Sequence, residues 1–177
     1  YYAYLRSAFF DGDFDFINEL NYVHTQRINK TGYIYNNKLI GQSILFFPFF
    51  LCGHFLAVAL NEFGYEFPLD GYSEPYFFST AIATATYVFA GLIILYHLLR
   101  KHFSPKPALL AVLSVWLGSP LLYYTFIRQR MAHGTEFFSS VIFGFLWLKY
   151  RRSDNFYHHA IIGCALGFLC MVRFINV

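Results

Sequence analysis

The sequence predicts an all-α membrane protein, a polytopic bundle of transmembrane helices. Three observations predict this class: 57% of the 177 residues are hydrophobic, only 13% are charged, and the apolar residues gather in long runs. Ordinary soluble domains contain about 25% charged residues, and a fold of this size cannot hide so much apolar surface from water. The composition also excludes a disordered chain, a disulfide scaffold and a nucleic-acid-binding module, so no nucleic acid is expected as a partner.

The first 38 residues form the polar part of the chain. Within them, Tyr1–Phe10 is strongly apolar and contains no helix breaker, which predicts a short interfacial helix that ends at Gly12. Asp13–Asn21 fits either a loop or another short helix.

Five apolar runs follow, and each has the roughly 20 residues that a membrane-spanning helix needs: 39–60, 76–99, 108–127, 131–148 and 156–177. Runs of this length exceed the strand of a membrane barrel, about 10 residues, so helix is the expected state. The run 39–60 is interrupted by Pro48 and by Gly41 and Gly53. It can therefore be a span or a broken, membrane-lying pair of helices.

The loops between the runs predict the orientation. The loops at 100–106 and 149–152 are basic and should lie in the cytoplasm, because cytoplasmic loops carry an excess of Lys and Arg. The loop at 61–75 contains acidic residues but no Lys or Arg, so we expect it outside. Four helices, about 76–99, 108–127, 131–148 and 156–177, then alternate in direction across the membrane.

Five ionisable side chains do not follow the distribution of charge that this orientation predicts. Arg128 and Arg130 lie in a short outer loop, where they favour either phosphate binding or contact with lipid headgroups. His133 and Glu136 are three residues apart and share a helix face at the same outer mouth. Arg173 lies near the outer end of the last run and needs a partner, either a phosphate or Glu136.

An acidic cluster, Asp11, Asp13 and Asp15, surrounds Gly12 near the start of the chain. Alternating carboxylates of this kind can bind Mg²⁺ or Mn²⁺ through hard oxygen ligands. The alternative interpretation is a solvated turn in which an aspartate caps a helix.

These pieces together resemble the GT-C glycosyltransferases, polytopic enzymes that use lipid-linked sugar donors, and in particular the bacterial mannosyltransferase and aminoarabinose-transferase type. Residues 1–16 (YYAYLRSAFFDGDFDF) resemble their first external loop. Tyr2, Arg6, Gly12, Asp13 and Phe14 occur in the order of that family's pattern. Further resemblance lies in residues 36–50 (NNKLIGQSILFFPFF), 70–76 (DGYSEPY), 120–124 (PLLYY), 131–138 (MAHGTEFF) and Arg173. The resemblance covers nearly the whole chain.

The resemblance implies that residues 1–75 form an external loop with membrane-lying helices and that residues 76–177 form four transmembrane helices. It places the catalytic carboxylate just before Tyr1, so we expect the chain to be a fragment of a longer protein, with Asp13 and Asp11 as second choices for the base. His133 and Glu136 occupy the position that binds a metal or the donor phosphate in this family. Arg128 and Arg130 are not part of the family pattern.

The expected activity is transfer of a sugar from a polyprenyl-phosphate donor to an acceptor on the outer face of a bacterial inner membrane, facing the periplasm. The phosphate- and substrate-binding candidates are Arg128, Arg130, Arg173 and Tyr2. Mg²⁺ or Mn²⁺ is the expected cofactor, with Asp11, Asp13 and His133 as candidate ligands. Two alternatives stay open: a transporter or flippase, which would also carry intramembrane arginine and broken helices, and a non-catalytic membrane subunit.

Overall fold

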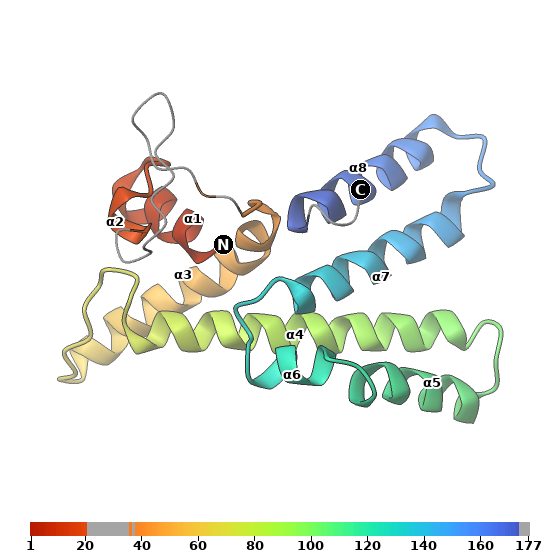
Figure 1. The fold of residues 1–177 in the computed structure, drawn as a ribbon, viewed down its shortest axis with the longest axis horizontal. Helices are drawn as coiled ribbons and strands as arrows, with labels where there is room; N and C mark the ends of the chain where they lie inside the picture. The colour runs from red at the N-terminus through yellow and green to blue at the C-terminus, as the bar shows by residue number, and fades with distance from the viewer. Residues whose placement is uncertain (21–35, 37, 174–177) are drawn as a thin grey trace. The chain divides into compact units, whose positions relative to one another are not determined.

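The computed structural model describes residues 1–20, 36 and 38–173. Within these residues the regular secondary structure is entirely helical (Figure 1). This confirms the predicted all-α class for the described part of the chain. The chain folds as two compact units, Tyr1–Thr80 and Ala81–Val177.

The first unit opens with the predicted short helix. α1 (Tyr2–Arg6) continues directly into η1 (Ser7–Asp11), a single turn of π-helix. Gly12 ends this helix with a φ of 70°, a left-handed conformation that glycine adopts without steric cost. A second short helix, α2 (Ile17–Leu20), follows, so the helical alternative for this segment is the correct one.

Of the two alternatives for the run 39–60, a span or a broken pair of helices, the broken pair does not form. α3 (Gly41–Glu62) is a continuous helix with Pro48 inside it. A proline removes one backbone N–H and can kink a helix without ending it when the neighbouring hydrogen bonds persist. Gly53 allows α3 to approach the start of α4 (Glu74–Leu99) closely, because an added Cβ there would lie 2.9 Å from the Tyr76 Cα.

α3 and α4 are the two described helices that are long and apolar enough to cross a membrane by length and composition. Only 28% of the apolar window of α3 and 39% of that of α4 is buried within the protein. Large apolar side chains therefore face outward from both helices, among them Phe55, Phe78 and Ile93, each more than half exposed. Outward apolar side chains are typical of a helix that lipid surrounds.

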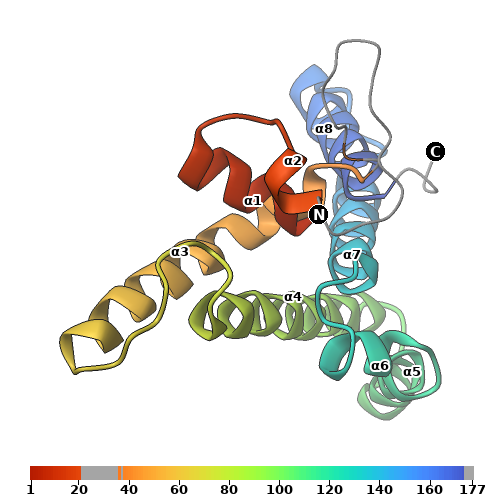
Figure 2. The same cartoon turned by 60° about the vertical axis from the view of Figure 1, so that its left-hand side comes forward.

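The second unit contains the rest of α4 and four further helices: α5 (Pro105–Leu117), α6 (Leu121–Phe126), α7 (His133–Tyr150) and α8 (Phe156–Val172). α7 and α8 form an antiparallel pair that lies side by side in Figures 1 and 2. The predicted helices over 76–99 and 131–148 are confirmed within two residues at each end. The predicted helix over 156–177 is confirmed up to Val172, and its last four residues lie outside the described part.

The prediction of one helix over 108–127 is wrong, because this run is divided into α5 and α6. Pro120 disfavours a helical conformation for the residue before it, and α5 ends at Gly118. The Ser119 hydroxyl donates to the Val115 carbonyl at 2.6 Å and accepts from the Leu121 amide at 3.2 Å. The Ser119 hydroxyl thus takes the place of part of the backbone hydrogen bonding that is lost where the helix is interrupted between α5 and α6.

One cluster of buried core residues in the second unit lies between α4, α5 and α6: Val88, Leu92, Val112 and Leu121. α7 approaches α4 closely at Gly134, where an added Cβ would lie 2.6 Å from the Thr84 Cγ2. Further along, Lys101 lies over the Phe145 ring. α4 and α7 therefore run in the same direction, and the start of α7 and the end of α8 share one end of the unit.

Candidate functional site

The end of the second unit where α7 begins and α8 finishes carries an arginine paired with residues of α7. Arg173 directly follows α8. Its Nη1 donates to the Glu136 Oε2 at 2.6 Å and lies 3.0 Å from the His133 Nδ1. The His133 Nδ1 and the Glu136 Oε2 are 3.7 Å apart. Together with Tyr124, whose ring stacks on His133, we call these residues the Arg173 cluster.

The hydrogen bonds of this cluster assign the tautomer of His133. A guanidinium can only donate, so the Nδ1 that faces it must accept, and the neutral ring then carries its proton on Nε2. The Tyr124 ring holds the imidazole in place, with ring centroids 3.8 Å apart and an angle of 24°. The side chains of His133, Glu136 and Arg173 are 29%, 18% and 30% exposed, so a ligand can reach them.

Arg128 and Arg130 lie in the turn between α6 and α7, at the same end of the unit. The Thr84 hydroxyl donates to the Gln129 carbonyl, and the Met131 amide donates to the Arg128 carbonyl at 3.0 Å. These bonds fix the turn around a hollow of about 180 Å³ that the turn residues line. The two arginines thus lie in the turn that precedes His133, whereas the predicted outer mouth of the membrane is not tested.

The first unit contains a second arginine, Arg6, between two carboxylates. Its Nη1 donates to Asp11 and to the Glu19 Oε1, the latter at 2.6 Å. Its Nε donates to the Asp70 carbonyl at 3.3 Å, and its guanidinium carbon lies 5.3 Å from the centroid of the Tyr72 ring. We call these five residues the Arg6 cluster, and they join the start of the chain to the turn before α4.

The Arg6 cluster is closed around Glu19. The Glu19 side chain is only 2% exposed, and its Oε2 has no hydrogen-bond partner among the described residues. Burial raises the pKa of the Glu19 carboxyl, although the hydrogen bond from Arg6 opposes this shift. A buried carboxylate held this way indicates a structural link more than a binding site.

Tyr2 also connects the start of the chain to the turn before α4. Its hydroxyl donates to the Gly71 carbonyl, and its ring contacts Phe50 and Phe77. Gly71 has a φ of 85°, and an added Cβ would lie 3.0 Å from the Arg6 Cγ, so no side chain fits at this position. The predicted substrate-binding role of Tyr2 is not tested by this position.

Asp11 and Asp13, the second-choice bases, are both hydrogen-bonded. Asp11 is paired with Arg6, as described above. The Asp13 Oδ1 accepts from the Ser7 hydroxyl at 3.0 Å and from the Asp15 amide at 3.2 Å, which stabilises the turn after η1. Within the described ranges, no three His, Cys, Asp or Glu side chains are grouped to hold a metal ion.

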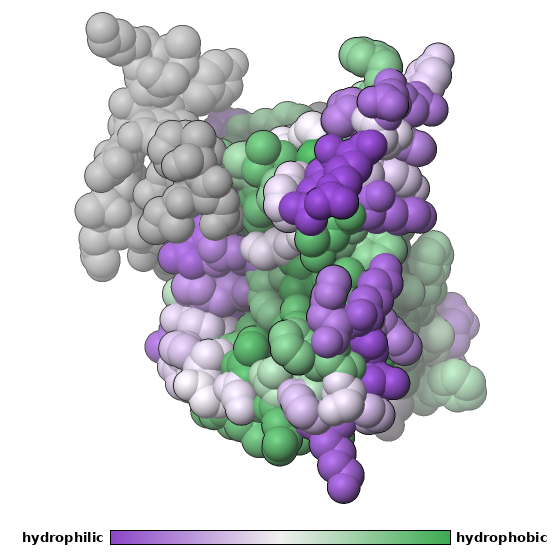
Figure 3. Space-filling view, turned by 90° about the vertical axis from the view of Figure 1, so that its right-hand side faces the viewer, coloured by the Kyte–Doolittle hydropathy of each residue, from purple (hydrophilic) through white to green (hydrophobic). Residues whose placement is uncertain are grey.

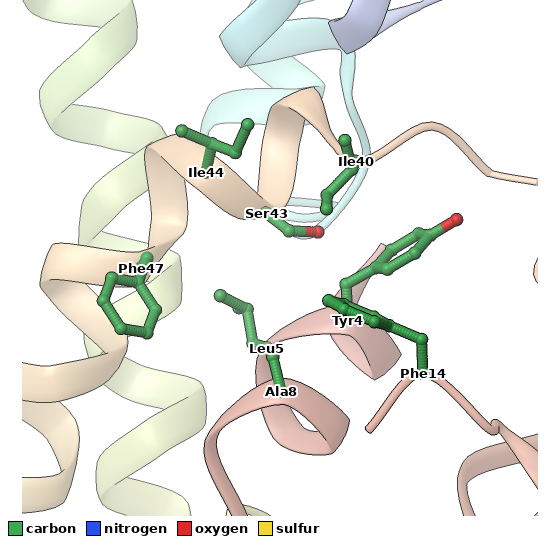
Figure 4. Close-up of a pocket in the computed structure, with 8 residues that line it drawn as sticks. All are labelled: Tyr4, Leu5, Ala8, Phe14, Ile40, Ser43, Ile44 and Phe47. Carbon is green, nitrogen blue, oxygen red and sulfur yellow. The ribbon is translucent and has the colours of Figure 1, made fainter. Parts of the chain in front are cut away.

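An apolar pocket of about 200 Å³ lies beside this turn, between the first helix and the start of α3 (Figure 4). Its two polar groups are satisfied by backbone carbonyls: the Tyr4 hydroxyl donates to Lys38 at 2.8 Å, and the Ser43 hydroxyl donates to Tyr1 at 2.6 Å. The remaining lining is aliphatic or aromatic: Leu5, Ala8, Phe14, Ile40, Ile44 and Phe47. This pocket fits an apolar group.

Comparison of the chain with protein-family profiles, with curated proteins and with solved structures finds no match.

Sequence reasoning did not single out as site residues Tyr124 of the Arg173 cluster or, in the Arg6 cluster, Arg6, Glu19, Asp70 and Tyr72. Tyr124 lies nine residues before His133, across the turn between α6 and α7, and the paired tyrosines of its motif were the available signal. Glu19 lies 13 residues after Arg6, and no helix or strand period relates the two positions. Only the folded path of the intervening segment brings them together.

Proposed function

We propose that this chain is part of an integral membrane glycosyltransferase that moves a sugar from a polyprenyl-phosphate donor to an acceptor on the outer face of the membrane. The Arg173 cluster carries this proposal. An arginine within an apolar helical unit is costly unless it serves a partner or a ligand. Glu136 orients this guanidinium, and His133 beside it adds an N–H donor. A cation and a donor at a partly exposed mouth suit a phosphate.

The transfer needs one bond to break and one to form. The bond between the sugar C1 and the donor phosphate oxygen breaks, and a bond between C1 and the acceptor oxygen forms, while the acceptor proton passes to a carboxylate. Arg173 and the His133 Nε2–H stabilise the negative charge that develops on the departing polyprenyl phosphate. Arg128 and Arg130 are further phosphate-binding candidates at the same end of the unit.

The base in this proposal is the carboxylate expected before Tyr1. Asp13 and Asp11 follow it as candidates, and Asp13 ranks above Asp11, because Asp11 would have to leave its ion pair with Arg6. An aspartate found shortly before Tyr1 in the full-length sequence would support the proposal. Its absence would favour the transporter or the non-catalytic subunit.

A divalent ion does not fit the Arg173 cluster as it is arranged. The His133 Nδ1 and the Glu136 carboxylate, which would be the ligands, both face the Arg173 guanidinium. We therefore assign no step to Mg²⁺ or Mn²⁺, and Arg173 supplies the positive charge.

The test measures sugar transfer by the full-length protein in proteoliposomes supplied with polyprenyl-phosphate sugars. We expect His133→Ala and Arg173→Ala to abolish transfer while the protein is still produced and folded. The matched controls are His102→Ala and Arg152→Ala, exposed residues of the two basic loops. Normal transfer by both site variants, or equal loss in the controls, would contradict the assignment.

A charge reversal separates chemistry from a purely structural ion pair. Glu136→Arg combined with Arg173→Glu keeps one pair of opposite charges between the two helices. If the pair is only structural, the double variant should recover transfer that the single variants lose. Our proposal predicts a folded protein without transfer, because the cation then projects from a different helix.

A further inference from the structure

The other end of the second unit carries an apolar crevice between α4 and α7. It has a volume of about 340 Å³ and is lined by Ile94, His97, Leu98, Lys101, Ile142 and Phe145. Phe145 lies 12 residues after His133, about 18 Å along the helix at 1.5 Å per residue. The crevice is therefore separate from the Arg173 cluster.

One lysine, Lys101, lines this crevice from the turn after α4, and a second, Lys149, lies on α7 one turn beyond Phe145. The Nζ atoms of Lys101 and Lys149 lie 5.7 Å and 5.9 Å from the centroid of the same Phe145 ring, and the Lys149 Nζ also lies 4.8 Å from the centroid of the Tyr150 ring. Among the described residues, neither ammonium group forms an ion pair with a carboxylate. Two like charges close to one ring repel each other, so an anion bound beside them would be favourable.

The wider surface at this end is also basic. Figure 3 views the molecule from this side and shows hydrophilic side chains in separate groups with hydrophobic surface between them. The basic side chains of the two loops are all exposed: Arg100, Lys101, Lys106, Lys149, Arg151 and Arg152. Asp154 is the single carboxylate in residues 100–106 and 149–155.

We propose that this crevice binds one anionic phospholipid, with part of an acyl chain against Ile94, Leu98 and Ile142 and the phosphate at Lys101, where the nearby charge of Lys149 adds to the attraction. The volume is many times the roughly 30 Å³ share of one water molecule, so a stretch of chain fits. A free phosphate would leave the apolar lining unused. Basic pockets between membrane helices are suited to anionic lipid headgroups. The proposal rests on the membrane location proposed above and is independent of sugar transfer.

The experiment uses the full-length protein, stripped of lipid in detergent and titrated with dioleoyl phosphatidylglycerol or dioleoyl phosphatidylcholine, with bound lipid counted by native mass spectrometry. We expect one phosphatidylglycerol to bind in preference to phosphatidylcholine. Lys101→Gln with Lys149→Gln should weaken binding about 30-fold, from about 1 kcal/mol per lysine near an anionic headgroup.

Two further variants separate the parts of the site. Lys106→Gln with Arg152→Gln removes the same charge from the same end of the unit and should leave binding unchanged. Ile142→Trp fills the crevice without changing charge and should abolish binding. Lys101→Arg with Lys149→Arg should retain binding, which shows that loss in the glutamine variant does not come from misfolding.

Three results would overturn the proposal: equal weakening in the Lys106 and Arg152 control, equal binding of phosphatidylcholine, or competition by glycerol phosphate at the lipid's own concentration. The last result would assign the lysines to a free phosphate. Failure of sugar transfer with intact lipid binding would instead contradict only the proposed enzyme.

Discussion

Arg6 and Arg173 both pair with carboxylates, but their surroundings differ. Arg6 is 16% exposed and binds a Glu19 side chain that is 2% exposed, so its cluster is nearly sealed. Arg173 is 30% exposed and lies beside a histidine whose second nitrogen is a donor. An arginine–carboxylate pair therefore joins segments of the chain in the first unit and stays partly open to a ligand in the second. The two clusters differ in the burial of the ion pair and in the presence of His133 beside Arg173.

The largest effect that would test this comparison is the loss of Arg6. Arg6→Ala leaves Glu19 buried without its cation, and breaking a buried pair in this way costs about 3 kcal/mol. Chemical unfolding of the full-length protein in detergent measures the loss, and Arg152→Ala is the exposed control. Adding Glu19→Gln to Arg6→Ala should restore part of the stability. An unchanged unfolding free energy in Arg6→Ala would remove the structural role of this cluster.

Helix packing gives the next largest effect. In Gly53→Ala the new Cβ meets the backbone of α4, including the Tyr76 Cα, and overpacking of this kind costs about 1–3 kcal/mol. At Gly163, inside α8, an added Cβ would have nothing within 4 Å of it among the described residues. Gly163→Ala should therefore stabilise the protein, by up to about 1 kcal/mol from helix propensity. Equal responses of the two variants in thermal unfolding would contradict the close approach at Gly53.

Tyr124 tests whether the Arg173 cluster depends on the position of its histidine. Tyr124→Leu removes the stacked ring, which is worth about 1 kcal/mol, so we expect sugar transfer to fall about fivefold. Tyr124→Phe keeps the ring and should transfer at the normal rate. A loss in Tyr124→Phe as large as in Tyr124→Leu would assign the effect to the hydroxyl instead of the stack.

The smallest effect is the pH dependence that Glu19 adds to stability. Burial raises the folded-state pKa of its carboxyl above its ordinary value of 4.5. The folded protein then binds more protons than the unfolded chain in this range, so stability falls as pH rises from about 4.5 through the raised pKa. Unfolding of Glu19→Gln should lack this component. A difference between the two proteins that stays constant from about pH 4 to about pH 7 would contradict the assignment.

The sequence predicted the second unit better than the first. Helices over 76–99 and 131–148 follow from long apolar runs bounded by charged loops, and alternating direction brings Arg173 to the same end as Glu136. The pair was one of two alternatives that the sequence left open for Arg173. In the first unit, the link between Arg6 and Glu19 depends on the path of short segments, which no hydrophobic period describes.

The prediction of a single helix over 108–127 is wrong for a different reason. The hydropathy of this run is continuous, but Gly118 and Pro120 change the backbone, and a window average does not register two residues. Over 39–60 the sequence leaves two alternatives open because Pro48 can break a helix, and the structure has the continuous one, since a helix can continue through one proline. Hydropathy located the apolar runs, whereas local backbone chemistry decided which of them are single helices.

The division of this run has a mechanical consequence in a bilayer. A straight helix adapts to a change in bilayer thickness by tilting as a whole. A run divided into α5 and α6 has two helix axes, so if it lies in a bilayer its reach is set by the angle at Ser119 and Pro120 as well as by its number of residues. The Ser119 hydroxyl already satisfies backbone groups at this joint. The single helix α4 has no such joint.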